Sequence, residues 1–362
     1  MLARRRTPRG ESDPLRLACA CNNSGTVVLF YKYVALSDPV STARKILDAS
    51  AKGAHSSVKG KIRIAREGIN ATFAASKKDD VEAFIEFLEG LPELTCLRGT
   101  DYKREPACSH AFGTLSVRVT EELCPFGEPD LSTIVDSEIE ITSLTPSEWD
   151  AALRERNEEE STVLDVRNFY ESRVGHFDGS VLAPIRRFSQ LKEWLARDDA
   201  LDNVAGRDVY IFCTGGVRCE KAATYLCSKL PADRRPRSVR KLEGGIVAYA
   251  RDFASSEDCL FKGSNYVFDA RGSVSVSDDL PSTSRCDGCD EQSGRLSKCV
   301  GRNCHVVLIA CETCGDTVYC CESCREQTER AVGIEKFKRR SCECDCFESR
   351  IRRCRTSEAQ IA

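Results

Sequence analysis

The sequence RDVYIFCTGGVRCEKAA, residues 207–223, decides the fold of the central part of the chain. Residues 209–212 are β-branched or aromatic, a composition typical of a buried strand, and Cys213 stands where that strand should end. The two adjacent glycines that follow allow the backbone to curl so that successive N–H groups point toward one centre. Because apolar residues recur at helical spacing after Cys219, the stretch predicts a strand, an anion-binding loop and a helix N-terminus.

Cys213 has surroundings that favour an anion. The loop N–H groups, the helix N-terminus and the guanidinium of Arg218 should all lower the pKa of this thiol, so we expect a nucleophile at neutral pH. The alternative is a buried structural cysteine, which needs neither paired glycines nor a closing arginine. Cys219 is either a helix-packing residue or a thiol that releases sulfur from Cys213 by forming a disulfide. The predicted site is therefore catalytic Cys213 and Arg218, with the loop residues Thr214, Gly215, Gly216 and Val217.

The loop resembles that of the rhodanese family, in which four residues separate the cysteine from the arginine. Related phosphatases have a loop one residue longer, so the resemblance implies a sulfur site. It implies a persulfide on Cys213, held by the N–H groups of residues 214–218. The longer string CTGGVRCEK, residues 213–221, is similar to the bacterial tRNA uridine hydroxylases that contain a rhodanese domain. This resemblance covers most of residues 26–325.

Further motifs carry the same resemblance. In the rhodanese family the acid and the arginine of a DVR motif support the active-site loop, which implies this role for Asp165 and Arg167. His176 lies in a GHF-x-G turn, where we favour a hydrogen-bonded structural histidine over a general base. The matching strings are AREGINATFA at 65–74, similar to the AEEGINGT region of the hydroxylases, DVR at 165–167, GHF-x-G at 175–179, LEGG-I at 242–246 and FKG-x-x-YVFD at 261–269.

Residues 141–272 alternate between apolar strand-like runs and helical patterns, which predicts a doubly wound parallel sheet. A helix should begin after Thr145, because Pro146 and Glu148 suit its first turn. In such sheets the ligand site lies at the carboxyl ends of the strands, where Cys213 is placed. We expect this part of the chain to be an α/β rhodanese domain.

Residues 26–120 follow the order strand, helix, strand, strand, helix, strand, with the last strand at residues 112–119. This βαββαβ order predicts an α+β domain of the ferredoxin or acylphosphatase type. The topology supports enzymes and RNA-binding domains alike, so it assigns no role by itself. Its basic strand with Lys61, Arg63 and Arg66 is equally compatible with an ordinary solvated face and with a surface for a phosphate backbone. The resemblance of residues 65–74 to the hydroxylases favours an RNA surface here.

Cysteines are concentrated toward the C-terminus, where 13 of the 22 follow residue 285. The arginine-rich first residues lack the apolar core of a secretory signal, so Cys-x-x-Cys pairs indicate metal ligation in a reducing compartment rather than disulfides. We expect two structural zinc ions in a cysteine-rich module of residues 286–325. The predicted ligands are Cys286, Cys289, Cys311 and Cys314 for the first ion, and Cys299, Cys304, Cys324 and either Cys320 or Cys321 for the second.

The remaining segments are expected to connect or extend these domains. Proline and glycine in residues 121–140, and serine and aspartate in residues 273–285, predict linkers. Residues 1–25 are expected to form a disordered basic arm rather than a mitochondrial presequence, and residues 326–362 a basic tail. A net charge of −3 argues neither for nor against nucleic acid. No apolar run is long enough to cross a bilayer, so we expect a cytoplasmic protein that does not contact membranes, of undetermined oligomeric state.

Three functions remain open. The resemblance to the hydroxylases implies oxygen-dependent 5-hydroxylation of the anticodon wobble uridine of tRNA, with Cys213 essential. The second function is a sulfurtransferase that moves persulfide sulfur from thiosulfate or a similar small donor to a thiol or carrier. The third is a non-catalytic interaction module, which would not need an intact Cys213 and Arg218. We favour the first, because sulfur transfer alone needs neither flanking domain; the sequence shows no organic-cofactor motif and no iron site of two histidines and a carboxylate.

Overall fold

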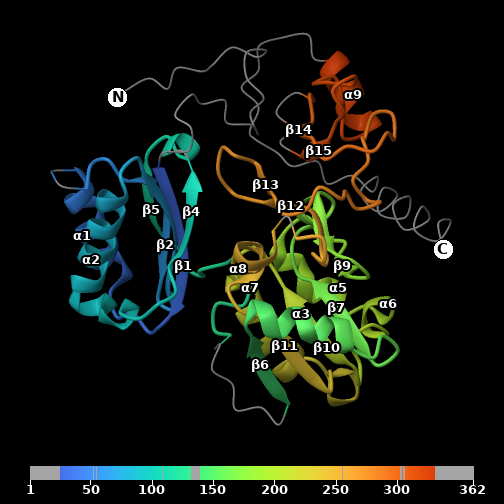
Figure 1. Cartoon of the computed structure of the whole chain (residues 1–362), viewed down its shortest axis with the longest axis horizontal. Helices are drawn as coiled ribbons and strands as arrows, with labels where there is room; N and C mark the ends of the chain where they lie inside the picture. The colour runs from blue at the N-terminus through green and yellow to red at the C-terminus, as the bar shows by residue number, and fades with distance from the viewer. Residues whose placement is uncertain are drawn as a thin grey trace.

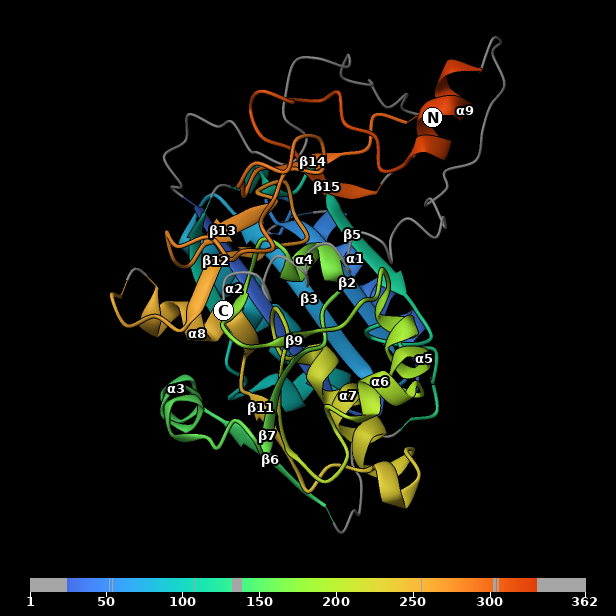
Figure 2. The same cartoon turned by 90° about the vertical axis from the view of Figure 1, so that its right-hand side faces the viewer.

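The structure is a computed structural model of the whole chain. It describes residues 25–330 except 52, 54, 108, 132–138, 255, 302, 303 and 305. Figure 1 shows the N-terminal domain beside the central domain, with the cysteine-rich module above the central domain, and Figure 2 shows the same molecule turned by 90°. The predicted basic arm up to residue 24, most of the basic tail and three cysteines without an assigned role, Cys342, Cys344 and Cys346, lie outside the described residues.

The N-terminal domain is a five-stranded sheet with two helices on one face (Figure 1). The strands lie in the order β4-β1-β3-β2-β5. Their side chains alternate, so that Val28 and Phe30 pack under the helices while Leu29 and Tyr31 lie on the opposite face, toward the central domain. The elements are β1 (Gly25–Tyr33), α1 (Pro39–Ala51), β2 (Lys59–Ala65), β3 (Gly68–Ala75), α2 (Lys78–Gly90), η1 (Pro92–Leu97), β4 (Lys103–Ala107), η2 (Ser109–Ala111) and β5 (Leu115–Val119).

The predicted α+β order is confirmed with one correction. The strand expected at residues 112–119 as the fourth is the fifth, β5, which lies at the edge of the sheet and runs parallel to β2. The fourth strand is β4, which pairs antiparallel with β1 at the other edge. Strand β4 was not predicted because its sequence, KREPA, is charged and contains proline, a composition that only edge strands tolerate.

The central domain is the predicted doubly wound α/β fold. Its five parallel strands lie in the order β6-β11-β10-β7-β9. Helices α3 and α8 cover one face with an aromatic cluster around Trp149, and α5, α6 and α7 cover the other. Thr145 caps α3 by accepting a hydrogen bond from the backbone N–H of Glu148, as predicted. The elements are β6 (Glu140–Leu144), α3 (Pro146–Glu155), β7 (Ser161–Asp165), α4 (Phe169–Ser172), β8 (Gly175–Phe177), β9 (Val181–Leu182), η3 (Phe188–Gln190), α5 (Leu191–Leu195), α6 (Asp198–Leu201), β10 (Asp208–Phe212), α7 (Val217–Ser228), η4 (Ala232–Arg234), β11 (Ser238–Leu242) and α8 (Gly245–Phe253).

The C-terminal part continues the central domain before it reaches the cysteine-rich module. Strand β12 (Phe261–Tyr266) lies between β8 and β13 (Ser273–Ser275) in a three-stranded sheet. The module itself contains β14 (Leu296–Lys298), β15 (Val307–Ile309) and α9 (Glu322–Glu329). None of the helices that the structure describes is long and apolar enough to span a bilayer.

The described residues of the two segments interpreted as linkers are packed rather than free. In the first, Phe126 and Leu131 are buried in the core of the central domain. In the second, residues 273–275 form β13, and Ser284 is fully buried with its hydroxyl donating to the carbonyl oxygen of Arg173 at 2.5 Å. Both segments therefore fix the position of one domain against another.

Lys221 of α7 fastens the N-terminal domain to the central domain. Its Nζ lies 2.8 Å from Oε2 of Glu67, in the turn between β2 and β3, and 3.0 Å from Oε1 of Glu122, which follows β5. Burial alone would lower the pKa of Lys221, but the two carboxylates raise it, so the side chain stays charged. These two ion pairs hold the N-terminal sheet so that its open face, the face without helices, is directed toward the N-terminus of α7.

Candidate active site

The predicted nucleophile loop lies at the carboxyl edge of the parallel sheet. Strand β10 ends at Phe212, Cys213 follows, and α7 begins at Val217. The backbone N–H of Gly216 donates to Sγ of Cys213 at 3.2 Å. Gly216 has a φ of 99°, a conformation that favours glycine, so the predicted curl of the loop is present.

The environment of Cys213 stabilises a thiolate. Burial by itself would raise the pKa of Cys213, which is 0% exposed. A hydrogen bond from the Cys219 thiol, the charge of Arg218 and the N–H groups of Arg218 and Gly216 outweigh burial and lower this pKa to about 5. Burial and the Cys213 thiolate raise the pKa of Cys219, which therefore remains a protonated donor. The two sulfur atoms are neighbours, as a resolving role for Cys219 requires, and that role stays a prediction.

Glu171 of α4 holds the loop arginine in place. Its Oε1 and Oε2 accept hydrogen bonds from Nη1 and Nη2 of Arg218 at 2.7 and 2.8 Å, and Nη2 also donates to Oγ1 of Thr214 at 3.0 Å. Glu171 is 0% exposed. Glu171 was not among the predicted site residues, because an acid in a short helix is ordinarily a solvated side chain. The available signal was the loop arginine itself, since a buried guanidinium requires a carboxylate partner.

Asp165 and Arg167 lie beside the end of the strand that precedes the loop, and their support of the loop stays a prediction. They form a fully buried ion pair at 2.6 Å, and Arg167 also donates to the carbonyl oxygen of Gly175 at 2.6 Å. The guanidinium of Arg167 lies over the ring of Phe212, the last residue of β10. His176 places Nδ1 2.9 Å from the carbonyl oxygen of Ser172, at the end of α4, in a structural contact of the kind expected.

The N-terminal sheet closes over the nucleophile loop. A Cβ at Gly215 would lie 2.8 Å from Cδ2 of Leu29, and one at Gly216 would lie 2.9 Å from Oη of Tyr31. The Tyr31 hydroxyl donates to Oε1 of Glu220 at 3.1 Å, which ties β1 to the first turn of α7. The paired glycines thus serve two purposes, because they shape the anion-binding loop and admit the N-terminal domain against it.

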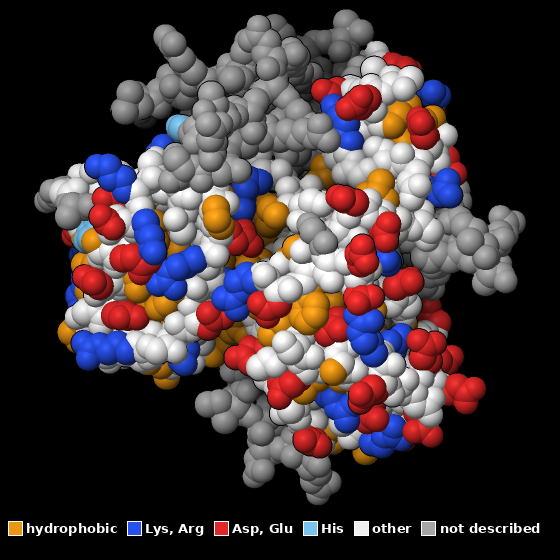
Figure 3. Space-filling view, viewed as in Figure 1, with side chains coloured by type: hydrophobic (Ala, Val, Ile, Leu, Met, Phe, Trp, Pro, Cys, Tyr) orange, Lys and Arg blue, Asp and Glu red, His pale blue; other side chains and the backbone are white. Residues whose placement is uncertain are grey.

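A cavity of about 470 Å³ lies between the nucleophile loop and the open face of the N-terminal sheet. Thr214, Gly215 and Arg218 line one side of it. Of the residues predicted to contact RNA, Lys61 and Arg63 line the opposite side, whereas Arg66 lies in the turn after β2. Figure 3 shows hydrophobic, basic and acidic side chains beside one another where the N-terminal domain meets the rest of the molecule. Further cations that line the cavity are Lys103, Arg186, Arg187 and Arg271.

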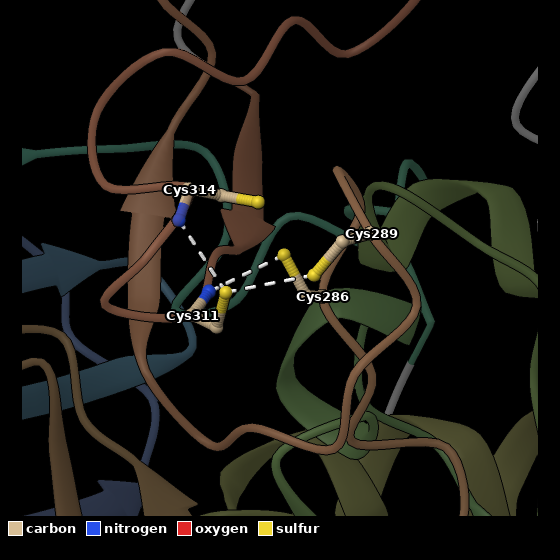
Figure 4. Close-up of side chains that lie close together, drawn as sticks. All are labelled: Cys286, Cys289, Cys311 and Cys314. Carbon is tan, nitrogen blue, oxygen red and sulfur yellow. Dashed lines mark hydrogen bonds between the residues drawn. The ribbon is translucent and has the colours of Figure 1, made fainter.

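The first predicted metal-binding group is assembled in the cysteine-rich module. Figure 4 shows the side chains of Cys286, Cys289, Cys311 and Cys314 directed toward one another. Their sulfur atoms all lie within 4.8 Å of one another, and Sγ of Cys289 is 3.6 Å from Sγ of Cys311. Four thiolates at the corners of a tetrahedron with Zn–S bonds of about 2.3 Å would be about 3.8 Å apart, so the group suits a tetrahedral metal ion.

The second metal-binding group shows which of Cys320 and Cys321 is its fourth member, a choice that the sequence left open. Cys299, Cys304, Cys320 and Cys324 bring their sulfur atoms together and are all buried. Cys321 instead caps α9, where its side chain accepts a hydrogen bond from the backbone N–H of Cys324. The structure thus confirms two four-cysteine groups that could each hold a metal ion, with Cys320 rather than Cys321 in the second.

A parallel α/β sheet that carries, in one loop, a cysteine and an arginine with four residues between them defines a rhodanese-like domain. Family models agree with this class. The model described as a rhodanese-like domain matches residues 148–252, the UPF0176 acylphosphatase like domain matches 25–123, and the Rhodanase C-terminal model matches 262–325.

Curated relatives identify the family more closely. A tRNA uridine(34) hydroxylase of Kocuria rhizophila is 34% identical over 80% of this chain and 93% of its own length. Proteins of the same name are 34% identical in Staphylococcus epidermidis, over 69% of this chain and 72% of the relative, and 30% identical in Listeria monocytogenes, over 88% of each. The chain belongs to the tRNA uridine(34) hydroxylase family.

Proposed function

We propose that this protein is a tRNA-modifying enzyme that catalyses the oxygen-dependent hydroxylation of C5 of the wobble uridine and requires Cys213 for this activity. The observation that carries the proposal is the position of the thiolate loop, which faces a cavity whose opposite wall is a basic strand of another domain. An anion-binding loop by itself can recognise only a small charged group. Selecting one nucleotide of a folded RNA requires a second surface that contacts phosphates while the base is extruded. The N-terminal sheet supplies this surface.

Sulfur transfer is the second candidate function, and the loop itself favours it. Four residues between Cys213 and Arg218 leave room for a persulfide whose terminal sulfur faces the inward-pointing N–H groups. The Cys213 thiolate would attack the outer sulfur of a small donor such as thiosulfate, whose S–S bond breaks and releases sulfite, and the persulfide would then pass that sulfur to an acceptor thiol. The two functions differ in what they require of the N-terminal domain, because a small donor makes no use of Lys61 and Arg63.

Reversing the charge of the cavity strand should weaken tRNA binding. In a Lys61→Glu, Arg63→Glu double variant two cations that face the cavity become anions, so affinity should fall and its salt dependence should flatten by about two phosphate contacts. The reactivity of Cys213 toward small sulfur donors should be unchanged. Binding is measured as Kd against salt concentration, with Arg66→Glu as the matched control because Arg66 is also exposed but lies in the turn outside the cavity.

Two outcomes would contradict this prediction. Wild-type affinity of the double variant at every salt concentration would show that this strand is scaffold. An equal loss in Arg66→Glu and in the double variant would show that the effect is general charge rather than a contact in the cavity.

We further propose that zinc is the metal of both four-cysteine groups. Closed sets of four thiolates are the donors that structural zinc prefers, and such sites stabilise a fold without catalysing a reaction. Purified protein should therefore contain about two zinc ions per chain by elemental analysis. Cys314→Ser should release one ion and unfold the cysteine-rich module at a lower temperature, whereas Cys96→Ser, a half-exposed thiol of η1, should keep both. Protein that contains no zinc when isolated would refute the assignment.

A further inference from the structure

Phe268 presents an exposed aromatic ring inside the active-site cavity. It is 50% exposed and lines the cavity. Among the described residues the other large hydrophobic side chains of comparable exposure, Val40, Leu47, Val119 and Leu280, do not line it. A single exposed hydrophobic residue on an outer surface is ordinary. An exposed ring that lines the cavity beside a nucleophile loop is not ordinary, because it lies where a ligand in the cavity would bind.

The turn that carries Phe268 is held by contacts with the N-terminal domain. Lys61 of β2 donates to the carbonyl oxygen of Phe268 at 2.6 Å. Arg271 pairs with Asp269 at 2.8 Å within the turn and with Glu105 of β4 at 2.9 Å. The backbone is therefore anchored to the N-terminal sheet on either side of the ring. The ring stays exposed although its backbone is fixed, so its exposure is a property of the built cavity.

The ring also contacts the group that closes the nucleophile loop. The guanidinium carbon of Arg218 lies 5.7 Å from the ring centroid of Phe268. The ring of Tyr266 packs edge-on against the ring of Phe268, with 5.2 Å between the ring centroids. A planar ligand on the exposed part of Phe268 would therefore lie next to the loop of Cys213. Arg218, fixed by Glu171, links the position of such a ligand to the position of the thiolate.

We propose that Phe268 is the platform on which the extruded base of the target nucleotide stacks. The proposal rests on the proposed function, because it takes the anticodon loop of tRNA as the ligand. Unpaired bases are held by aromatic side chains together with cations that contact the backbone, and the cavity combines Phe268 with Lys61 and Arg63. Stacking does not distinguish one base from another, so Phe268 provides affinity and orientation while other contacts select uracil.

A double-mutant cycle between Phe268 and the base tests the platform by binding alone. The probes are two anticodon stem-loop RNAs, one with uridine and one with an abasic ribose at position 34. Phe268→Leu keeps an apolar side chain but removes the ring, and Phe268→Tyr keeps the ring. Phe268→Leu should bind the uridine RNA about tenfold more weakly than wild type and the abasic RNA equally well. Phe268→Tyr and the surface control Val40→Ala should bind both RNAs as wild type does.

Each outcome of this experiment either supports or overturns the role of Phe268 as a platform. Equal effects of Phe268→Leu on the two RNAs, or no effect on either, would overturn the platform and leave the proposed function intact. Wild-type protein that binds neither RNA would overturn the proposed function and the platform with it. Thermal unfolding of each variant checks that its fold is intact, and loss of affinity for both RNAs in Phe268→Tyr as well would assign the residue to packing instead.

Discussion

Cys213→Ser should bind tRNA as tightly as wild type and form no 5-hydroxyuridine. Serine fills nearly the same space, so the loop and the cavity should persist. A pKa of about 5 gives roughly a hundredfold excess of thiolate over thiol at pH 7, and a serine hydroxyl does not ionise in this range. Enzymes that lose their nucleophile commonly lose a factor on the order of 10⁴ or more in rate. The rate of modification is measured by mass spectrometry of nucleosides after incubation with unmodified tRNA.

Two controls accompany this variant. Cys96→Ser removes a half-exposed thiol of η1 and should leave the rate unchanged. The wild-type rate should fall as the pH drops through about 5, because protonation of Cys213 then removes the thiolate. A Cys213→Ser protein that retained a tenth of wild-type activity would contradict a nucleophilic role.

Glu171→Gln should destabilise the protein and impair the site together. Burial alone would lower the pKa of Arg218, but Glu171 raises it well above its usual value, so the guanidinium is charged. Glutamine keeps the shape of the side chain and removes the compensating charge. Breaking a buried ion pair on one side typically costs about 3–5 kcal/mol in the free energy of unfolding. Arg218 and Thr214 would lose their common partner, so the rate of modification should also fall.

The matched control is Glu160→Gln, which removes an exposed carboxylate 3.3 Å from Arg237. Exposed pairs contribute little, so urea unfolding should hardly change for this variant. Equal midpoints for Glu171→Gln and Glu160→Gln would show that the Arg218 pair does not support the loop.

Local chemistry made much of this molecule predictable. The strand, the glycine pair and the arginine around Cys213 lie within one short segment, so the sequence alone placed the thiol at the edge of a parallel sheet. Spacing likewise assigned the first metal group, since its four cysteines form two Cys-x-x-Cys turns. Adjacent Cys320 and Cys321 could not be separated, because the choice depends on which sulfur faces the group and which caps α9.

Features that depend on contacts between distant segments could not be predicted. Glu171 is 47 positions from the arginine that it holds, and nothing in its neighbours distinguishes it from a solvated acid. The contacts of Leu29 and Tyr31 with Gly215 and Gly216 join two domains, so the second purpose of the paired glycines appears only in the folded chain. Phe268 belongs to a string noted only for its resemblance, and its exposure inside the cavity required the assembled structure.

The most direct test of the account is mass spectrometry of tRNA nucleosides from cells that lack this gene and carry either the wild-type or the Cys213→Ser sequence. We expect 5-hydroxyuridine at the wobble position to be absent without the gene, to return with the wild-type sequence and not to return with Cys213→Ser. Normal wobble uridine modification in the deletion strain, together with a loss of thiosulfate sulfurtransferase activity, would contradict the hydroxylase function and favour sulfur transfer.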